Sequence, residues 1–481
     1  MKKFIFIVAL VLAAGVFFYQ SFSNYFFQDD FFDIVLSRSQ SLGSAFDIFR
    51  KPILDFVFYR PITTQLFWNL SYKQFGLNPL GYHLISFVFF SINILLVWYL
   101  VKLLTSKVSV TYLTTFLYAF SSTHFYRLFS LTQFQEIGLT CFVLLTTIFY
   151  IKKNKLSILF FILALMSKET AVITPVILCI YDLFYKRKWS KLLTLHFLIL
   201  AFYFITRFIF FGFASGSSYN YDFHPKQVLN NYFWYFLWGL GIPESFVNLK
   251  LFFVNKFNDV GQFQSFSFFN TDVFTSFGIW GGPIVVSFCL FILTALLGFT
   301  RKNLEVIFKR EFLFAVSLFV FFLLPVAFFP FHKFAYSLTL PVAGLCLALA
   351  IFISNLSFRF VVFLVFFYFI LSFFTQQYNL SHHWATGKAF TAKTAFTYLS
   401  SNYPDISGYH NIYFQNDDRN FCSPNRPGKN ISSEVAYGIG GVEGLRLLYN
   451  IPSLQVYFWD WDKDKNLKGD SLVLDSRLFL R

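Results

Sequence analysis

The sequence contains few charged residues. Asp, Glu, Lys and Arg together make up 13% of its 481 residues, whereas a soluble domain usually carries about 25%. Hydrophobic residues reach 56% and the mean hydropathy is +0.58. This shortage of charge excludes an ordinary soluble protein, and we expect a polytopic α-helical membrane protein of the plasma or inner membrane, in contact with lipids on most of its surface.

Cysteine is also scarce, and repeats are absent. Cys422 is the only one of the five cysteines in the polar C-terminal part, and the other four lie in apolar runs. One cysteine cannot close a disulfide within that part, and no Cys/His spacing typical of a zinc site occurs. No repeat of 20 to 50 residues is visible, which excludes a repeat architecture.

The positive charge lies between the apolar segments. The net charge is +15, and basic clusters occur at residues 152–155, 186–188 and 301–310. Such clusters are typical of cytoplasmic loops. Membrane orientation therefore explains most of the charge, and we expect no nucleic-acid partner.

The first apolar segment follows Lys2 and Lys3 and covers residues 4–22. About 19 residues can span a hydrocarbon core of ~30 Å, which favours a retained helix over a cleaved signal peptide. Counting apolar segments from there predicts about 11 transmembrane helices, with the aromatic stretch within residues 231–248 lying in the interface. The expected spans are residues 4–22, 82–104, 108–120, 133–151, 156–166, 171–185, 192–211, 277–299, 311–330, 337–353 and 360–374.

This topology predicts two domains. Residues 1–375 form the membrane domain, with an acidic first outer loop at residues 23–80. Residues 376–481 are polar and long enough for a small extracytoplasmic α/β domain. Strand-like runs occur there at residues 411–415, 454–459 and 472–474, and residues 442–449 have the pattern of a helix.

Three carboxylates, Asp29, Asp30 and Asp33, follow the first segment among Phe residues. Charges at a bilayer surface are costly unless solvated or paired, so this cluster is a candidate functional site. Neighbouring rings should raise the pKa of a carboxyl group, which suits a base that accepts a proton from a hydroxyl. The same pair of acids, Asp29 and Asp30, could instead bind a divalent metal cation, and a solvated pair facing headgroups is the structural alternative.

Arg60 precedes Pro61, which fits the first turn of a helix. A guanidinium and free backbone N–H groups at such a helix start could together bind a phosphate. The alternatives are an ion pair with Asp55 and an arginine that reaches the lipid headgroups.

Lys168 and Glu169 lie at the outer tip of a short helical hairpin. They are candidates for substrate binding, and a purely structural ion pair is the alternative. Glu136 lies in the first turn of a span, where a carboxylate also favours the helix N-terminus. His332 and Lys333 form an outer turn that faces the same side.

The order of these motifs resembles the GT-C superfamily of glycosyltransferases that use polyprenyl-phosphate sugars, which includes protein O-mannosyltransferases and lipid A aminoarabinose transferases. The resemblance covers about residues 1–355. The matching segments are Gln28-Asp29-Asp30, Tyr59-Arg60-Pro61-Ile62-Thr63-Thr64, residues 75–83, residues 130–136, Ser167-Lys168-Glu169-Thr170, and His332-Lys333-Phe334-Ala335-Tyr336 with residues 340–344 after it.

The resemblance implies an inverting sugar transfer from a polyprenyl-phosphate donor to an acceptor on the extracytoplasmic face. It implies that Asp29 or Asp30 acts as general base or contacts a metal, and that Arg60 and Lys168, with Lys333, face the phosphate. Glu136 or Glu169 would orient these groups. The sequence at residues 124–127 departs from the His-Pro and Trp pattern of close relatives. The acceptor therefore stays open between protein, lipid and polysaccharide.

Two other classes of function compete with this hypothesis. A transporter or flippase for a lipid-linked or anionic substrate would also need charges in a membrane protein, but transporters place them near the bilayer midplane, often in repeated halves. A binding protein could use aromatic residues of the C-terminal part to stack on sugars, although such residues are more often core.

Overall fold

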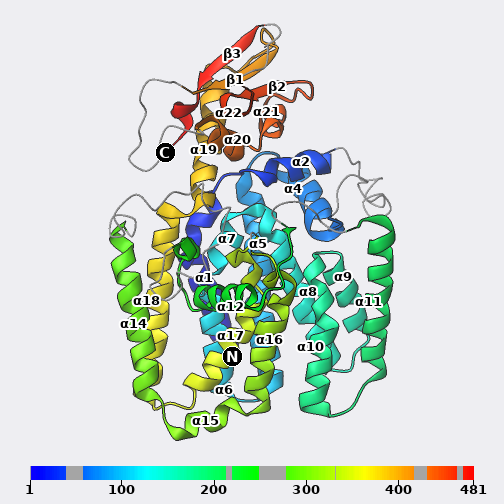
Figure 1. Cartoon of the computed structure of the whole chain (residues 1–481), viewed down its shortest axis with the longest axis vertical. Helices are drawn as coiled ribbons and strands as arrows, with labels where there is room; N and C mark the ends of the chain where they lie inside the picture. The colour runs from blue at the N-terminus through cyan, green and yellow to red at the C-terminus, as the bar shows by residue number, and fades with distance from the viewer. Residues whose placement is uncertain are drawn as a thin grey trace.

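The computed structural model describes residues 2–38, 58–212, 219–248, 278–330, 332–416, 431–462 and 470–480. The chain is mostly helical, with a helical bundle below and a small sheet above it (Figure 1). Asp47 and Asp55 lie outside the described residues.

Six of the described helices are long and apolar enough to cross a membrane. Length and composition therefore support a helical membrane protein, but they support six spans and not the predicted 11. The six are α5 (Pro79–Thr105), α8 (Phe134–Ile151) extended by η4 (Leu131–Gln133), α11 (Lys191–Phe210), α14 (Gly278–Gly298), α16 (Arg310–Ala327) and α18 (Phe358–His382).

The difference arises because several predicted spans form shorter helices. A helix of 12 residues, such as α6, is only about 18 Å long, which is less than the ~30 Å of a hydrocarbon core. In the region of the predicted hairpin, residues 156–185, two short helices are joined by the 3-10 helix η5. The short helices are α1 (Lys2–Phe17), followed by η1 (Tyr19–Ser23), then α6 (Val108–Ala119), α9 (Leu156–Leu165), η5 (Glu169–Ile173), α10 (Thr174–Tyr181), η6 (Asp182–Lys186) and α17 (Pro341–Ile353).

Local sequence signals set the ends of the spans. Asn78 caps α5 by accepting a hydrogen bond from the Leu80 N–H at 3.1 Å, and Pro79 begins the helix. Ser190 caps α11 in the same way through the Leu193 N–H. Gly344 allows α17 to approach α16, because a Cβ atom there would lie 2.6 Å from the Ala315 carbonyl oxygen.

Helix α12 (Pro225–Gly239) falls in the stretch predicted to lie in the interface. It is not among the six candidate spans. Trp234, Tyr235 and Trp238 are buried, and Asn231 donates a hydrogen bond to the Ala327 carbonyl of α16 at 2.8 Å. These three rings therefore pack inside the protein, and the interfacial position of α12 stays a prediction.

The first outer loop contains helices, where the sequence indicated only a polar stretch. The described elements are α2 (Asp29–Arg38), η3 (Pro61–Leu66), α4 (Phe67–Phe75) and the short α7 (His124–Phe129) of the next outer loop. Segment η3 is a π-helix that starts at Pro61, as predicted from the proline. It packs against both α2 and α8 and so joins the loop to the bundle.

Helix α18 continues to His382, past the expected domain boundary at residue 375, and α19 (Trp384–Asn402) follows at once. The three predicted strand regions form one parallel sheet of order β2-β1-β3, in which Ile412 pairs with Val456 and Leu472. The elements of this part after α19 are β1 (Asn411–Gln415), α20 (Ile431–Ile439), α21 (Val442–Tyr449), β2 (Gln455–Phe458), α22 (Trp459–Asp462), β3 (Ser471–Asp475) and η12 (Ser476–Phe479).

The C-terminal part shares a hydrophobic core with the first outer loop. Phe26, Phe31 and Trp68 belong to the same buried cluster as Phe396 and Leu445. The rings of Phe31 and Phe396 are stacked, with centroids 5.1 Å apart. The sheet and its helices are therefore packed onto α2 and α4 and are not a separate tethered unit.

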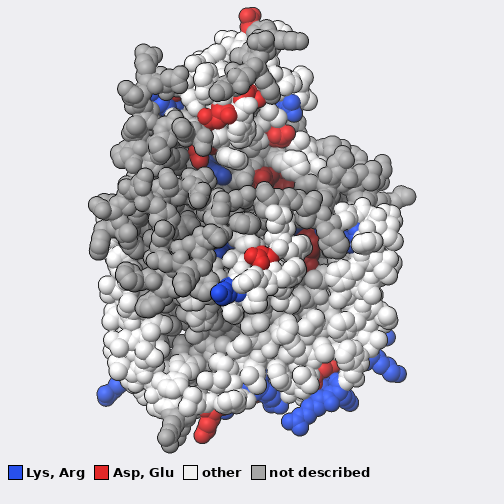
Figure 2. Space-filling view, in the orientation of Figure 1, with Lys and Arg blue, Asp and Glu red and all other residues white. Residues whose placement is uncertain are grey.

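Lys and Arg side chains lie along the lower edge of the molecule in Figure 2, at the end of the bundle that holds α15 (Arg301–Ile307) and the connection from α10 to α11 (Figure 1). The connection from α10 to α11 contains the exposed Arg187 and Lys188. Helices α2 and α4 lie at the opposite end. This separation is what the positive-inside rule expects if α2 and α4 face the extracytoplasmic side.

Candidate functional site

Asp30 is buried, and both of its carboxylate oxygens accept hydrogen bonds. One oxygen accepts from the Phe27 N–H at 3.0 Å, and the other accepts from the N–H and hydroxyl of Thr132 at 2.9 and 2.6 Å. Burial raises the pKa of Asp30 to about 7, although the Thr132 and Phe27 donors oppose the shift. Asp30 thus ties α2 to the loop before α8.

Asp29 differs from Asp30 because its side chain is exposed. No hydrogen bond to its carboxylate occurs among the described residues. Desolvation by the surrounding protein raises the pKa of Asp29, and the positive charge of the Lys388 ammonium lowers it. Asp33, one turn further, is buried, and burial followed by the charges of Asp29 and Asp30 raises its pKa. We call these three acids the acidic cluster, and Asp29 is its exposed member.

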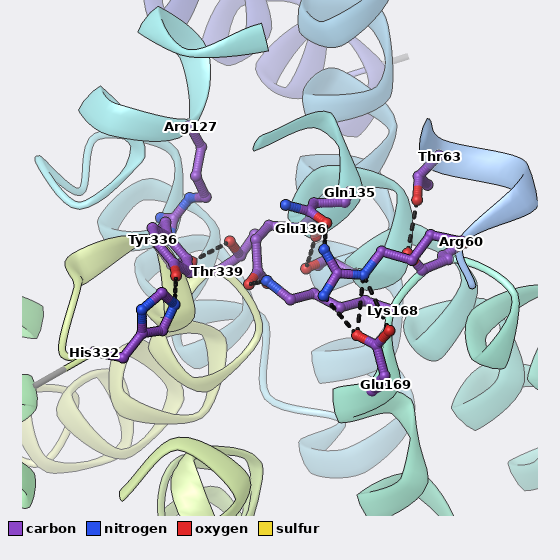
Figure 3. Close-up of polar contacts among 12 residues, drawn as sticks. Arg60, Thr63, Arg127, Gln135, Glu136, Lys168, Glu169, His332, Tyr336 and Thr339 are labelled. Carbon is purple, nitrogen blue, oxygen red and sulfur yellow. Dashed lines mark hydrogen bonds and ion pairs between the residues drawn. The ribbon is translucent and has the colours of Figure 1, made fainter. Parts of the chain in front are cut away.

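Arg60 lies at the start of η3 and binds Glu169 through two nitrogens. Its Nη2 and Nε atoms donate to Glu169 Oε2 at 2.7 and 3.0 Å, and Nη1 donates to the amide oxygen of Gln135 (Figure 3). Arg207 of α11 approaches the other oxygen of Glu169 at 3.6 Å. The neighbouring Thr63 hydroxyl donates to the Ser167 carbonyl at 2.7 Å, which holds η3 against the hairpin turn.

Lys168 points away from Glu169 and pairs with Glu136, at 2.5 Å between Nζ and Oε1 (Figure 3). Its ammonium also lies 4.9 Å from the centre of the Tyr336 ring. Burial lowers the pKa of Lys168, and Glu136 opposes that shift. The two adjacent hairpin residues therefore form two ion pairs with distant partners and do not pair with each other.

We call Arg60, Glu136, Lys168, Glu169 and Arg207 the charge-pair cluster. Its three cationic side chains face two carboxylates, so one positive charge is in excess within it. Such a cluster attracts an anion while its own charges stay partly compensated.

His332 and Lys333 are neighbours in one turn but contact different parts of the protein. His332 Nε2 lies 2.7 Å from the Tyr336 hydroxyl, and burial together with Lys168 and Arg60 lowers the pKa of His332 to about 4. The imidazole is therefore neutral at pH 7. Lys333 is buried and donates to the side chain of Asn231 on α12 at 3.2 Å, and burial lowers its pKa to about 8.

The acidic and charge-pair clusters border the same region. Tyr219 lies beside His332, with ring centroids 4.6 Å apart, and Arg60 and Asp29 both act on the pKa of Tyr219, which burial raises. Arg60 likewise lowers the pKa of Asp33. Figure 2 shows acidic side chains set back between the upper and lower parts of the molecule. Charged groups of both clusters thus interact at the end of the bundle that holds α2 and α4.

Several residues of this region were missed in the sequence. Arg207 is a lone arginine near the C-terminal end of the apolar helix α11. A single charged residue in such a helix is a candidate site residue, so the sequence alone could have indicated Arg207. Gln135 and Tyr336 lie within the matched motifs, but nothing in the sequence distinguishes them from their neighbours. Lys388 lies in a stretch of α19 rich in Ala and Thr, and no local pattern points to it.

A divalent cation stays a prediction. Within the described residues, no group of three or more His, Cys, Asp or Glu is placed to hold a metal ion. The oxygens of Asp30 already accept three hydrogen bonds, so a cation near the acidic cluster would depend mainly on Asp29 and on substrate oxygens.

The chain is similar to a protein O-mannosyl-transferase of Caenorhabditis elegans, with 28% identity over 183 residues. The matched part covers 37% of this chain and spans about a quarter of the relative, 26% of its length. No protein-family model and no solved structure matches the chain. This similarity and the apolar helices together support a membrane glycosyltransferase.

Arg127, on α7, contacts backbone carbonyls and polar side chains of neighbouring segments. It is buried, its Nη1 donates to the carbonyls of Ala335 and Tyr336 at 3.3 and 3.0 Å, and its Nη2 contacts His124 and Thr123 (Figure 3). It therefore holds the outer turn next to the charge-pair cluster.

Arg127→Met should destabilise the protein. Two buried carbonyls lose their donor, so we expect the free energy of unfolding to fall by about 2–3 kcal/mol. The thermal midpoint of the detergent-purified protein measures this effect. Arg187→Met, at an exposed inner position, should leave the midpoint unchanged, and an unchanged midpoint for Arg127→Met would contradict the assignment.

Proposed function

We propose that this chain is an integral membrane glycosyltransferase that moves a sugar from a polyprenyl-phosphate donor to an acceptor at the extracytoplasmic end of the bundle. The observation that carries the proposal is one arrangement: an accessible carboxylate, Asp29, shares a region with the Arg60 and Lys168 ion pairs, while the basic loops lie at the other end. A base and a phosphate-binding group on one side are what this transfer requires.

In the proposed reaction, the Asp29 carboxylate accepts the proton of the acceptor hydroxyl. The acceptor oxygen then forms a bond to the anomeric carbon from the face opposite the phosphate, which inverts the configuration. The bond between that carbon and the phosphate oxygen breaks, and its electron pair stays on the phosphate. Arg60 and Lys168 stabilise this new negative charge, while Glu169 and Glu136 keep both cations in place.

The relative's name makes mannose the first sugar to test and a protein the first acceptor. We extend both to this chain as part of the proposal. Membranes that contain the chain are incubated with a panel of polyprenyl-phosphate sugars labelled in the sugar, polyprenyl-phosphate-mannose among them. We expect label in a protease-sensitive product, and label absent from membranes that contain Asp29→Asn.

A counterflow assay separates this function from transport. The acidic cluster lies on α2, at the end of the bundle opposite α15 (Figure 1), and Arg60 begins η3, which packs against α2. Transporters instead place such charges near the bilayer midplane. Counterflow of a labelled lipid in proteoliposomes, without sugar transfer to any acceptor, would overturn the proposal in favour of a transporter or flippase.

The rate should depend on the protonation of Asp29. Only the deprotonated carboxylate accepts a proton, and the surrounding protein raises its pKa while Lys388 opposes the rise. We therefore expect kcat/KM to be full at high pH and to fall as the pH drops through this raised pKa, above the ordinary value of about 3.9. A pH profile between about pH 4.5 and 8 measures it. A flat profile over that range would contradict Asp29 as the base.

A further inference from the structure

The residue before Asp29 is held in place by the C-terminal part of the chain. Gln28 has a positive φ of 52°, and its N–H donates to the Gly438 carbonyl at 3.1 Å. Its side-chain oxygen accepts a hydrogen bond from Lys388 Nζ at 3.2 Å. A Cβ atom on Gly440 would lie 2.6 Å from the Gln28 carbonyl oxygen, so the contact requires a glycine there.

Two aromatic rings surround Lys388 and hold its ammonium near Gln28. It lies one helical turn after Trp384 on α19, and its ammonium is 4.9 Å from the Trp384 ring centre and 4.7 Å from that of Tyr437. Two aromatic faces and the Gln28 oxygen restrict the ammonium to one position. Asp29 and Glu434 supply the negative charges that it faces.

The other charges near Asp29 do not replace Lys388. Asp30 and Asp33 lie on the same helix, and their interactions with Asp29 are repulsive. The charge of Asp29 also raises the pKa of Tyr126 and of Tyr219. Helices α4 and α21, which pack against α2, carry the charged side chains Lys73, Glu443 and Arg446, and none of them forms a hydrogen bond or ion pair with Asp29 within the described residues. Arg60 of η3 acts on Asp33.

We infer that Lys388 is a positioning residue for Asp29: through Gln28 and its own charge, it fixes the Asp29 carboxylate toward the region it shares with Arg60 and Lys168. This inference rests on the proposed function. It makes the C-terminal part a component of the site, because the group that orients Asp29 comes from α19 and the backbone that holds Gln28 comes from α20.

The first test measures activity with polyprenyl-phosphate-mannose labelled in the sugar. At a pH below the Asp29 pKa, Lys388→Met should lower kcat about tenfold with KM little changed, because loss of the neighbouring positive charge raises the carboxyl pKa by about one unit and so leaves less of the carboxylate deprotonated. Lys388→Arg should restore most of the rate. Lys388→Gln keeps a hydrogen-bond donor for Gln28 but loses the positive charge. It replaces Lys388→Met in this test if the methionine variant does not fold. Lys393→Met, an exposed lysine on the same helix, is the matched control and should be unchanged.

The second test needs no activity. In an Asp29→Cys variant, a nearby ammonium favours the thiolate, which is the reactive form. We expect a membrane-impermeant maleimide to label Asp29→Cys several-fold more slowly when Lys388→Met is added, with Lys388→Arg restoring the rate and Lys393→Met leaving it unchanged. Labelling of the Cys-containing wild type is subtracted as background.

The two tests separate failure of the inference from failure of the proposed function. An unchanged labelling rate in the Lys388→Met background overturns the inference, whatever the activity. A slower rate, together with full sugar transfer by Asp29→Asn, supports the contact but overturns the proposed function. Loss of transfer in Asp29→Asn with wild-type kcat in Lys388→Met overturns the inference alone.

Discussion

Replacing Asp29 by asparagine is expected to lower kcat for sugar transfer by about 10²–10⁴-fold, the range that a positioned general base contributes. Asparagine keeps the size of the side chain and its exposure but cannot accept the hydroxyl proton. The measurement is the initial rate with labelled polyprenyl-phosphate-mannose at fixed protein concentration. Because Asp29 accepts no hydrogen bond among the described residues, the variant should fold like the wild type and keep its thermal midpoint.

Asp30→Asn provides the informative contrast. Its carboxylate accepts three hydrogen bonds from Phe27 and Thr132, so the substitution should lower the thermal midpoint while the folded fraction still turns over. Glu443→Gln on α21 is a neutral control near the same core. Full activity in Asp29→Asn together with loss of turnover in folded Asp30→Asn would reverse the roles assigned to the two acids.

Arg60→Gln should lower kcat by about two to three orders of magnitude, because a preorganised group that stabilises charge in the transition state typically contributes that much. The substitution also leaves Glu169 without its main partner, at the 2.7 Å contact with Nη2. The single variant alone therefore does not separate a phosphate-binding role from a structural ion pair.

The double variant Arg60→Gln with Glu169→Gln makes this separation. If the pair were only structural, a neutral hydrogen-bonded pair would recover most of the activity and the thermal midpoint. If Arg60 stabilises the departing phosphate, the midpoint recovers and kcat stays as low as in Arg60→Gln. Recovery of kcat would remove Arg60 from the mechanism, and Arg187→Gln at the inner surface serves as the control for lost positive charge.

Local signals predicted much of the fold. The proline at residue 61 marked the start of η3, and the strand patterns found all three strands of the C-terminal sheet. Helix lengths were predicted less well, because apolar composition does not tell how far a helix continues before a 3-10 or π turn interrupts it. Helices α9 and α10 are separated in this way, and α18 instead runs on into polar sequence.

The site was predicted as a set of residues but not as a set of contacts. The pairing of Lys168 with Glu136 joins residues 32 apart, and that of Arg60 with Glu169 joins residues 109 apart. Neither spacing is a local signal, so adjacency in the sequence suggested the wrong partner for Lys168. Lys333, predicted beside the phosphate, instead contacts Asn231. Its place in the mechanism stays a prediction.

The shared core of α2 and the C-terminal sheet has a consequence for biosynthesis. Gln28 leaves the ribosome 360 residues before Lys388, a delay of roughly 20–70 s at typical elongation rates. Throughout that interval the aromatic residues of α2 can pack against α4 and η3 but not against the C-terminal part of the chain. A chain that ends before α20 lacks the contact that holds Gln28, so we expect such truncated polypeptides to be inactive in the proposed transfer and to depend on chaperones.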